Sequence, residues 1–244
     1  MLKNSDWMII NSIAYKIHAI EDLDQMRLEV MEQLKHLISY DSSSFYLGSS
    51  RNLNELQKPV GICYAKEDME AYINQYKNVD YSEGLMATGK NIVYRESDII
   101  EEAVRIQSDY YKSVYDVQGW HYSLHHNICY NEQFLGVMSF FRKKGKENFT
   151  YDDIFVLDML KDHLALRLFQ NLDKKLTAEA CITQYHLSKR EADVLRCLMT
   201  NKTMEEITKQ LAISINTLHK HASHIYEKLE VSGRLQMYDK IENK

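Results

Sequence analysis

The sequence predicts two parts of different fold class: an α+β part with an antiparallel sheet flanked by helices, followed by an all-α part. Three observations predict this division. Apolar and polar residues alternate over residues 122–130, and an apolar run at 134–142 follows three polar residues later, which is typical of a β-hairpin. Before and after this hairpin, apolar residues recur at the three- and four-residue spacing of helices. Between 171 and 185 the chain is polar with only scattered apolar residues, as expected of a domain boundary.

The length and charge of the chain agree with two domains. Its 244 residues, 45% of them hydrophobic and 27% charged, suffice for two ordinary folded domains. We expect them at 1–172 and 185–244, with a linker at 173–184. The net charge of −5 is uneven, because residues 183–244 carry +2 and the remainder −7. This asymmetry favours a nucleic-acid module at the C-terminal end.

Several protein classes are disfavoured. No apolar run approaches the roughly 18 residues of a membrane helix, and the first residues lack a basic-then-apolar leader, so we expect a cytoplasmic protein without membrane contact. The four cysteines form no C-x-x-C pair, which argues against a disulfide framework or a zinc ribbon. No P-loop, nucleophile elbow, metalloprotease motif or dinucleotide motif occurs, so neither enzymatic activity nor a cofactor is expected.

The elements of the first part can be placed in order. Asp22, with Gln25 three residues on, predicts a capped helix start. Residues 43–47 and 61–65 are predicted to be short strands. In the hairpin, one face of the first strand is apolar and the other polar, whereas the second strand is apolar on both faces and is expected at the centre of its sheet.

A long helix is predicted after the hairpin. Thr150 can cap it, with Asp153 at the third position. The helix shows two apolar stripes: Ile154, Leu157, Leu160, Leu164 and Leu168 on one side, and Phe155, Met159, Leu166 and Phe169 on another. Such a helix must be covered twice. Either a second copy of the chain covers the outer stripe, giving a homodimer, or the helix is fully buried in a larger core.

The second part contains four capped helices. The capping residues are Ser188 with Glu191, Thr203 with Glu206, Ser214, and Ser232. Two short helices, a tight connection at 212–213 and a longer third helix match the helix-turn-helix arrangement that reads the major groove of double-stranded DNA. The third helix has a buried stripe of Leu218, Ala222, Ile225 and Leu229, and its other sides carry Asn216, Thr217, His219, Lys220, His221, Ser223, His224 and Lys228. Such side chains suit phosphates and base edges.

The segments LSKREADVL, ITKQLAIS, TLHKH and IYEKLEV, followed by Arg234, resemble in register the C-terminal tetrahelical domain of the LuxR family of transcription regulators. The resemblance implies sequence-specific DNA binding, with RNA polymerase as a further partner and a fourth helix that forms dimers. His219, Lys220 and Ser223 would face bases or nearby phosphates, and His221 and Lys228 the backbone. The remaining expected DNA-binding positions are Thr203, Ser214, Asn216 and Thr217.

Two positions depart from the family pattern. Glu205 and His219 each stand where the family has lysine, and both changes remove positive charge from the side that meets phosphate. An alternative reading is therefore a protein-interaction module whose degraded helix-turn-helix binds DNA weakly or not at all.

The first part resembles, less specifically, the GAF-like sensory domains that are fused to LuxR-type helices. The resemblance rests on QYKNVDY, RESD, the Tyr110–Tyr111 pair, LGVMSFFR and the long helix. It implies a sensory and dimerisation domain that gates DNA binding through a small-molecule effector. Tyr64, Tyr76, Trp120 and Tyr122 are candidates to line an aromatic pocket, although such residues more often belong to a core.

The histidines could also suggest metal sites, but this is the weaker interpretation. His121, His125 and Cys129 share a strand face. This arrangement favours a polar face or pocket wall over a metal site. His221 and His224 share a helical face, where contact with DNA is the better explanation.

Overall fold

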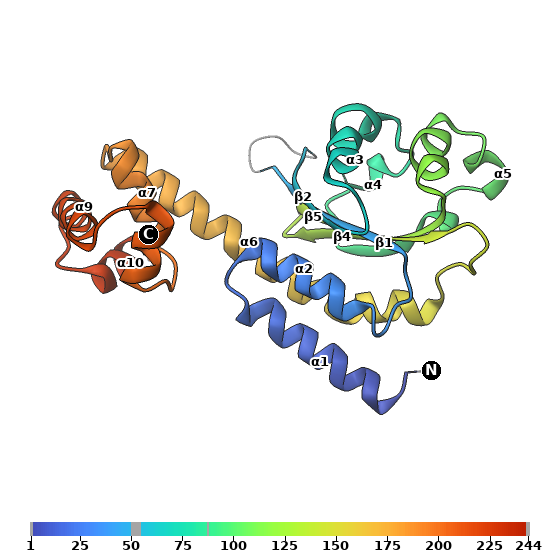
Figure 1. Cartoon of the computed structure of the whole chain (residues 1–244), viewed down its shortest axis with the longest axis horizontal. Coiled ribbons are helices and arrows are strands. Elements are labelled where there is room, and N and C mark those ends of the chain that lie inside the picture. Colours follow the sequence, from blue (N-terminus) through green and yellow to red (C-terminus); the bar gives the residue numbers. More distant parts are fainter. Residues whose placement is uncertain (1, 50–54, 87, 243–244) are drawn as a thin grey trace. The chain divides into compact units, whose positions relative to one another are not determined.

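The computed structural model describes residues 2–49, 55–86 and 88–242, except for the side chains of residues 173–177 and 242. The chain forms two compact units, Met1–Phe169 and Gln170–Lys244, and Figure 1 shows the elements of each. Within the described ranges, no helix has the length and apolar character needed to cross a membrane.

The first unit is built on a five-stranded antiparallel sheet of order β2-β1-β5-β4-β3. Its strands are β1 (Ser42–Gly48), β2 (Leu56–Ile62), β3 (Ile92–Arg95), β4 (Trp120–Tyr130) and β5 (Gln133–Lys143). The predicted hairpin is confirmed as β4 and β5. Asn131 and Glu132 both adopt left-handed φ angles, 48° and 62°, the type I′ turn that matches strand twist. β5 lies at the centre of the sheet, as its two apolar faces predict.

The strand predicted at 61–65 is wrong in position. The strand ends at Ile62, because Cys63 has a left-handed φ of 51° and Ala65 is already the N-cap of α3 (Lys66–Ala71). Pro59 is tolerated in β2 because this strand lies at the edge of the sheet.

Helices cover both faces of the sheet (Figure 1). One face is covered by α1 (Asn4–Ala19), α2 (Leu23–Leu34) and the first part of α6 (Tyr151–Gln184). The other face is covered by α3, α4 (Glu83–Met86), α5 (Glu102–Arg105) and two π-helical segments, η1 (Tyr72–Tyr76) and η4 (Tyr111–Asp116). The polar face of β4 is therefore buried: Ser123, His125 and Asn127 are at most 7% exposed.

Helix α6 begins as predicted and ends later than expected. The Thr150 N–H donates to Asp153 Oδ2 at 2.7 Å, and the Asp153 N–H donates to Thr150 Oγ1 at 3.2 Å. The inner stripe from Leu157 to Leu168 is buried, apart from a partly exposed Ile154 before it. The helix continues through the predicted linker at 173–184, whose backbone is helical.

The second unit contains α7 (Lys189–Leu198), α8 (Met204–Leu211), α9 (Ile215–Lys228) and α10 (Arg234–Glu242). Reciprocal capping boxes at Ser188/Glu191 and Thr203/Glu206, and the Ser214 cap, are confirmed. Ser232 is not the N-cap of the fourth helix: α10 begins at Arg234, so Gly233 occupies the cap position, and the Ser232 N–H donates to Gln236 Oε1 at 2.9 Å.

Candidate nucleic-acid interface and sensory cavity

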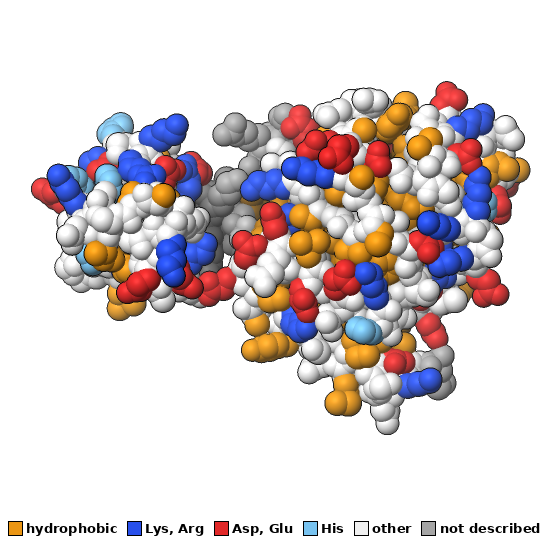
Figure 2. Space-filling model, viewed as in Figure 1, with side chains coloured by type: hydrophobic (Ala, Val, Ile, Leu, Met, Phe, Trp, Pro, Cys, Tyr) orange, Lys and Arg blue, Asp and Glu red, His pale blue; other side chains and the backbone are white. Residues whose placement is uncertain are grey.

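Helix α9 presents two opposite faces. Leu218, Ala222 and Ile225 are at most 1% exposed and pack into the core of the second unit. The other side of the helix and its first turn bring together most of the predicted DNA-binding residues as exposed side chains: Ser214, Asn216, Thr217, His219, Lys220, Ser223 and Lys228. His221 is half-buried, and Thr203 is exposed at the start of α8. Figure 2 shows histidine and basic side chains on the surface around α9.

The connection between α8 and α9 is held rigidly. Ala212 adopts a left-handed φ of 51° at the end of α8, and Arg190 Nη2 donates to the Leu211 carbonyl at 2.7 Å. Ser214 then accepts from the Thr217 N–H at 3.1 Å, which starts α9. The first turn of α9 is thereby fixed relative to α8, as a recognition helix requires.

Lys228 is engaged inside its own domain. Its Nζ donates to Glu191 Oε2 at 2.7 Å and to the His186 carbonyl at 3.4 Å. Burial alone would raise the pKa of Glu191, but hydrogen bonds from Lys228 and Ser188 hold it at about 2. This contact gives Lys228 a stabilising role that the sequence analysis did not assign to it.

Arg234 has a structural role that local sequence patterns do not reveal. Its guanidinium donates to the carbonyls of Leu198 and Lys202, each at 2.9 Å, and to that of Thr200. Tyr238 Oη lies 2.7 Å from the Leu198 carbonyl and 2.8 Å from the Thr200 carbonyl, so its one proton can be donated to either. These bonds satisfy the carbonyl group of the last residue of α7 and two carbonyl groups in the connection between α7 and α8. Their donors lie more than thirty residues away in sequence.

The first unit encloses a small cavity of about 20 Å³ between the sheet and the helices on its polar side. Such a space holds about one water molecule. The side chains that line it are mostly aromatic or hydroxyl-bearing and include Ser44, Tyr46, Tyr64, Tyr72, Asp80, Ser82, Tyr94, Tyr110, His125 and Ser139.

Of the four predicted pocket residues, Tyr64 alone lines this cavity. Trp120 is 1% exposed and stacks on Phe141, with 3.9 Å between ring centres, because it packs into the aromatic core instead. Tyr76 packs against the same core from η1. The Tyr122 ring lies 5.9 Å from the Arg105 guanidinium, away from the cavity.

Asp80 is the polar centre of the cavity wall, and the sequence analysis did not single it out. It is 7% exposed and accepts hydrogen bonds of 2.7 Å from Tyr72 Oη, from the Ser82 N–H and from Ser82 Oγ. Burial, together with the Asp80 charge, raises the pKa of Tyr72 well above its usual range, so the phenol remains a donor. The sequence signal was its position within QYKNVDY.

His125 forms another part of the wall. Its Nδ1 lies 2.8 Å from Ser139 Oγ and its Nε2 lies 2.7 Å from Ser123 Oγ. Burial lowers its pKa to about 4, so the imidazole is neutral near neutral pH. His121 instead bonds Tyr111 and Glu102, and across the described part of the chain no three His, Cys, Asp or Glu side chains are grouped to hold a metal ion.

Both units are similar to known proteins. Residues 185–241 match the model of the bacterial regulatory proteins of the luxR family. The spore germination protein GerE of Bacillus subtilis is 44% identical over 50 residues, which cover 20% of this chain and 68% of GerE. A GAF domain of a phosphoenolpyruvate-protein phosphotransferase from Coxiella burnetii matches 71% of this chain and 99% of its own, with a TM-score of 0.50 and 13% identity.

Escherichia coli SdiA matches 97% of this chain and 96% of its own, with a TM-score of 0.45 and 18% identity. The predicted fold class, a GAF-like α+β unit followed by a helix-turn-helix unit, is confirmed. Through its C-terminal unit, this chain belongs to the LuxR family of bacterial regulatory proteins and is a DNA-binding transcription regulator.

Proposed function

We propose that α9 reads operator DNA while the N-terminal unit binds a small-molecule effector that controls this binding. The observation that carries the DNA part is the exposed polar face of α9, opposite a fully buried stripe. His219, Lys220 and Ser223 would meet base edges or nearby phosphates. Thr203, Ser214, Asn216, Thr217 and His221 would contact the backbone or adjacent bases. Lys228 is already bonded to Glu191, so a contact between Lys228 and a phosphate would have to form beside that bond.

Genomic fragments bound by the full chain after crosslinking would supply the operator. Fluorescence anisotropy with that operator and with random DNA then tests the face of α9. Lys220→Ala should weaken operator binding more than binding to random DNA, since a base contact carries about 1–3 kcal/mol of discrimination. Lys189→Ala is the matched control, because Lys189 is an exposed lysine at the start of α7. Equal affinity for all fragments, with no effect of Lys220→Ala, would favour the protein-interaction alternative.

Asp80 carries the effector part of the proposal. A carboxylate enclosed by tyrosines accepts hydrogen bonds and therefore suits an effector with an N–H, O–H or ammonium donor and an otherwise apolar or aromatic body. At about 20 Å³ the cavity must expand to admit such a molecule. Two π-helical segments adjoin it: η1 contains Tyr72, and η4 follows directly after Tyr110. Such segments are frequent at functional sites.

Native mass spectrometry of the full chain, incubated with extract of its host cells, tests the effector. We expect a bound small molecule that changes operator affinity and is lost in Asp80→Asn. Asp162→Asn, a change on the exposed surface of α6, should retain it. Effector control would be contradicted if no small molecule is found bound and no extract fraction changes the affinity for DNA.

We also propose that the regulator is a cytoplasmic homodimer that meets RNA polymerase at its promoters. Apolar side chains of the outer stripe of α6 support the dimer: Phe155 and Met159 are 44% and 42% exposed. On the adjacent α1, Met8 and Tyr15 are exposed, and the Trp7 ring contacts that of Phe155. A second copy covering this surface would remove it from water.

A further inference from the structure

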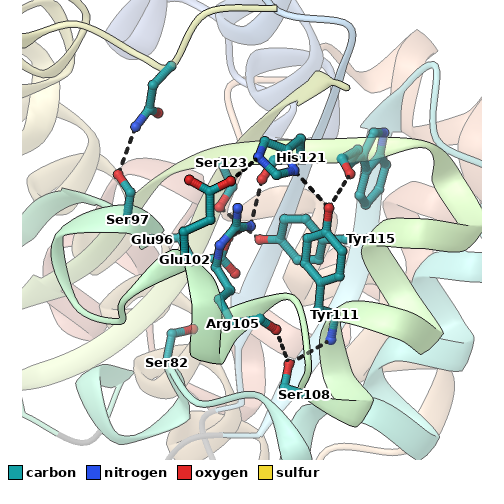
Figure 3. Close-up of polar contacts among 12 residues, drawn as sticks. Ser82, Glu96, Ser97, Glu102, Arg105, Ser108, Tyr111, Tyr115, His121 and Ser123 are labelled. Carbon is teal, nitrogen blue, oxygen red and sulfur yellow. Dashed lines mark hydrogen bonds and ion pairs between the residues drawn. The ribbon is translucent and has the colours of Figure 1, made fainter. Parts of the chain in front are cut away.

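Asp80, in the wall of the cavity, is a buried carboxylate without a cationic partner. Among the described residues, no lysine or arginine forms an ion pair with it. Lys77, three residues earlier in the chain, pairs with Glu83 at 3.1 Å. The buried guanidinium of Arg105 pairs with Glu96 at 2.8 Å (Figure 3). Since buried charges in proteins are ordinarily paired, the carboxylate of Asp80 lacks the counter-ion that its burial calls for.

The histidine of the cavity wall does not supply this positive charge. Burial lowers the pKa of His125 to about 4, although the charge of Asp80 acts in the opposite direction. Both ring nitrogens lie within hydrogen-bond distance of serine hydroxyls, that of Ser139 at 2.8 Å and that of Ser123 at 2.7 Å. The imidazole is therefore uncharged and satisfied near neutral pH, and it leaves the charge of Asp80 uncompensated.

Asp80 also has capacity to accept a further hydrogen bond. An ionised carboxylate offers about four acceptor positions, shared between its two oxygens. The Ser82 N–H and Ser82 Oγ both donate to Asp80 Oδ1, each at 2.7 Å, whereas Oδ2 accepts from Tyr72 Oη at 2.7 Å. Within the described part of the chain, Oδ2 therefore keeps one open position, which a donor of a ligand can take without displacing an existing bond.

The remaining lining of the cavity suits a cation. Aromatic rings come from Tyr46, Tyr64, Tyr72, Tyr94 and Tyr110, and the described lining contains no lysine or arginine. The faces of aromatic rings attract cations, most strongly where water is excluded. The buried Tyr94 hydroxyl has no hydrogen-bond partner among the described residues, so its oxygen is open to a further donor.

We propose that the effector of this cavity is a cationic amine whose –NH₃⁺ group is the counter-ion of Asp80. An ammonium group has three N–H donors: one would bind Asp80 Oδ2 and a second Tyr94 Oη. The cavity of about 20 Å³ holds one group of the size of water, as such a head is, and expansion would admit the apolar body of the amine. A neutral amide or alcohol would leave the charge uncompensated. This inference names the effector class of the proposed function and rests on it.

Matched amines and alcohols test the proposal on the full chain. The probes are the primary amines from ethylamine to hexylamine and 2-phenylethylamine, each compared with the alcohol of the same carbon skeleton. Phosphate buffer at neutral pH keeps the amines protonated, and Tris is avoided because it is itself a primary amine. Isothermal titration calorimetry measures Kd. At least one amine should bind roughly thirtyfold or more tightly than its alcohol, because only the amine pairs the buried charge.

Asp80→Asn removes the charge and keeps the shape of the side chain, so it should weaken amine binding by roughly thirtyfold or more. Asp162→Asn, the same change on the exposed surface of α6, is the matched control and should bind amines as the wild type does. The proposal is overturned if no amine binds, if amine and alcohol bind equally, or if Asp80→Asn keeps its affinity for the amine. If Asp80→Asn fails to fold, the comparison of amines with alcohols in the wild type still decides.

The outcomes for the effector class and for effector control can be told apart. A neutral molecule recovered from host-cell extract that requires Asp80 and changes operator affinity would uphold the proposed function and overturn this inference. Amines that bind at Asp80 without changing operator affinity would uphold this inference and contradict effector control.

Discussion

Glu205 is an exposed carboxylate at the second position of α8, where the LuxR pattern has lysine. Negative charge at a helix N-terminus stabilises the helix by about 0.3–1 kcal/mol but repels phosphate. Glu205→Lys should therefore tighten binding to operator and random DNA alike and steepen the salt dependence by roughly one unit of logarithmic slope. Glu67→Lys in α3 makes the same charge change at an exposed position of the first unit and is the control. Fluorescence anisotropy over a series of salt concentrations measures this slope. An unchanged slope in Glu205→Lys would mean that the start of α8 does not face the DNA backbone.

The Glu191–Lys228 pair makes the stability of the second unit depend on pH. The folded pKa of Glu191, about 2, lies below the unfolded value of about 4.3, so its contribution is present above pH 4 to 5 and is lost as pH falls towards 2. Lys228→Met should cost roughly 1 kcal/mol, because the lysine is partly exposed and solvent screens part of its attraction to Glu191. Hydrogen exchange of α7 and α9 in the full chain measures this loss. Wild-type protection in the variant would return Lys228 to a DNA-binding role alone.

At the scale of the element, the N-cap serine of α9 and a serine on its exposed face should differ in their effect on stability. Ser214 caps the helix, so Ser214→Ala should destabilise the second unit by about 1 kcal/mol. Ser223 is exposed in the middle of the helix, so Ser223→Ala should change stability by less than about 0.5 kcal/mol and yet weaken operator binding. Denaturant unfolding followed by circular dichroism, paired with anisotropy, tests both. Equal losses of stability would contradict the division of roles.

At the scale of the whole molecule, we expect a homodimer of twice the 28.8 kDa chain mass. Replacing Phe155 and Met159 together by glutamate should dissociate it, because charge would enter the apolar surface of α6. Val117→Glu changes another exposed apolar residue, outside that surface, and should leave the dimer intact. Sedimentation equilibrium at micromolar concentration measures both, and a monomeric wild type would refute the dimer.

The domain limits are tested at the same scale. Residues 183–244 are predicted to fold alone, but Ala178 and Cys181 near the end of α6 are also buried. A fragment of residues 170–244 should therefore have a higher free energy of unfolding than one of residues 183–244, by roughly 1 kcal/mol or more, because it buries more apolar surface. Denaturant unfolding of the two fragments measures this difference. A random-coil spectrum for the longer fragment would contradict an independent second unit.

Local interactions explain what could be predicted from sequence. The caps of α2, α6, α7, α8 and α9, the β4–β5 hairpin and the buried stripe of α9 all depend on residues within a few positions of one another. The exposed face of α9 follows from the same periodicity, so most candidate DNA contacts were predictable. The ends of β2 and α10 were misplaced, because the left-handed Cys63 and the cap position of Gly233 leave little periodic signal.

By itself, the sequence determined the family, the two fold classes and the helix that we propose meets DNA, because these depend on short-range pattern. Only the tertiary structure decided which residues form the cavity. In the folded chain Trp120 lies in the core and not at the cavity, and Asp80 and His125 form the polar part of the cavity wall. It also joined His125 to Tyr115 through Ser123, and Arg234 to the end of α7. His125 and Arg234 each have a partner at least fourteen residues away, Ser139 and Leu198, and only the folding of the chain brings such partners within hydrogen-bond distance.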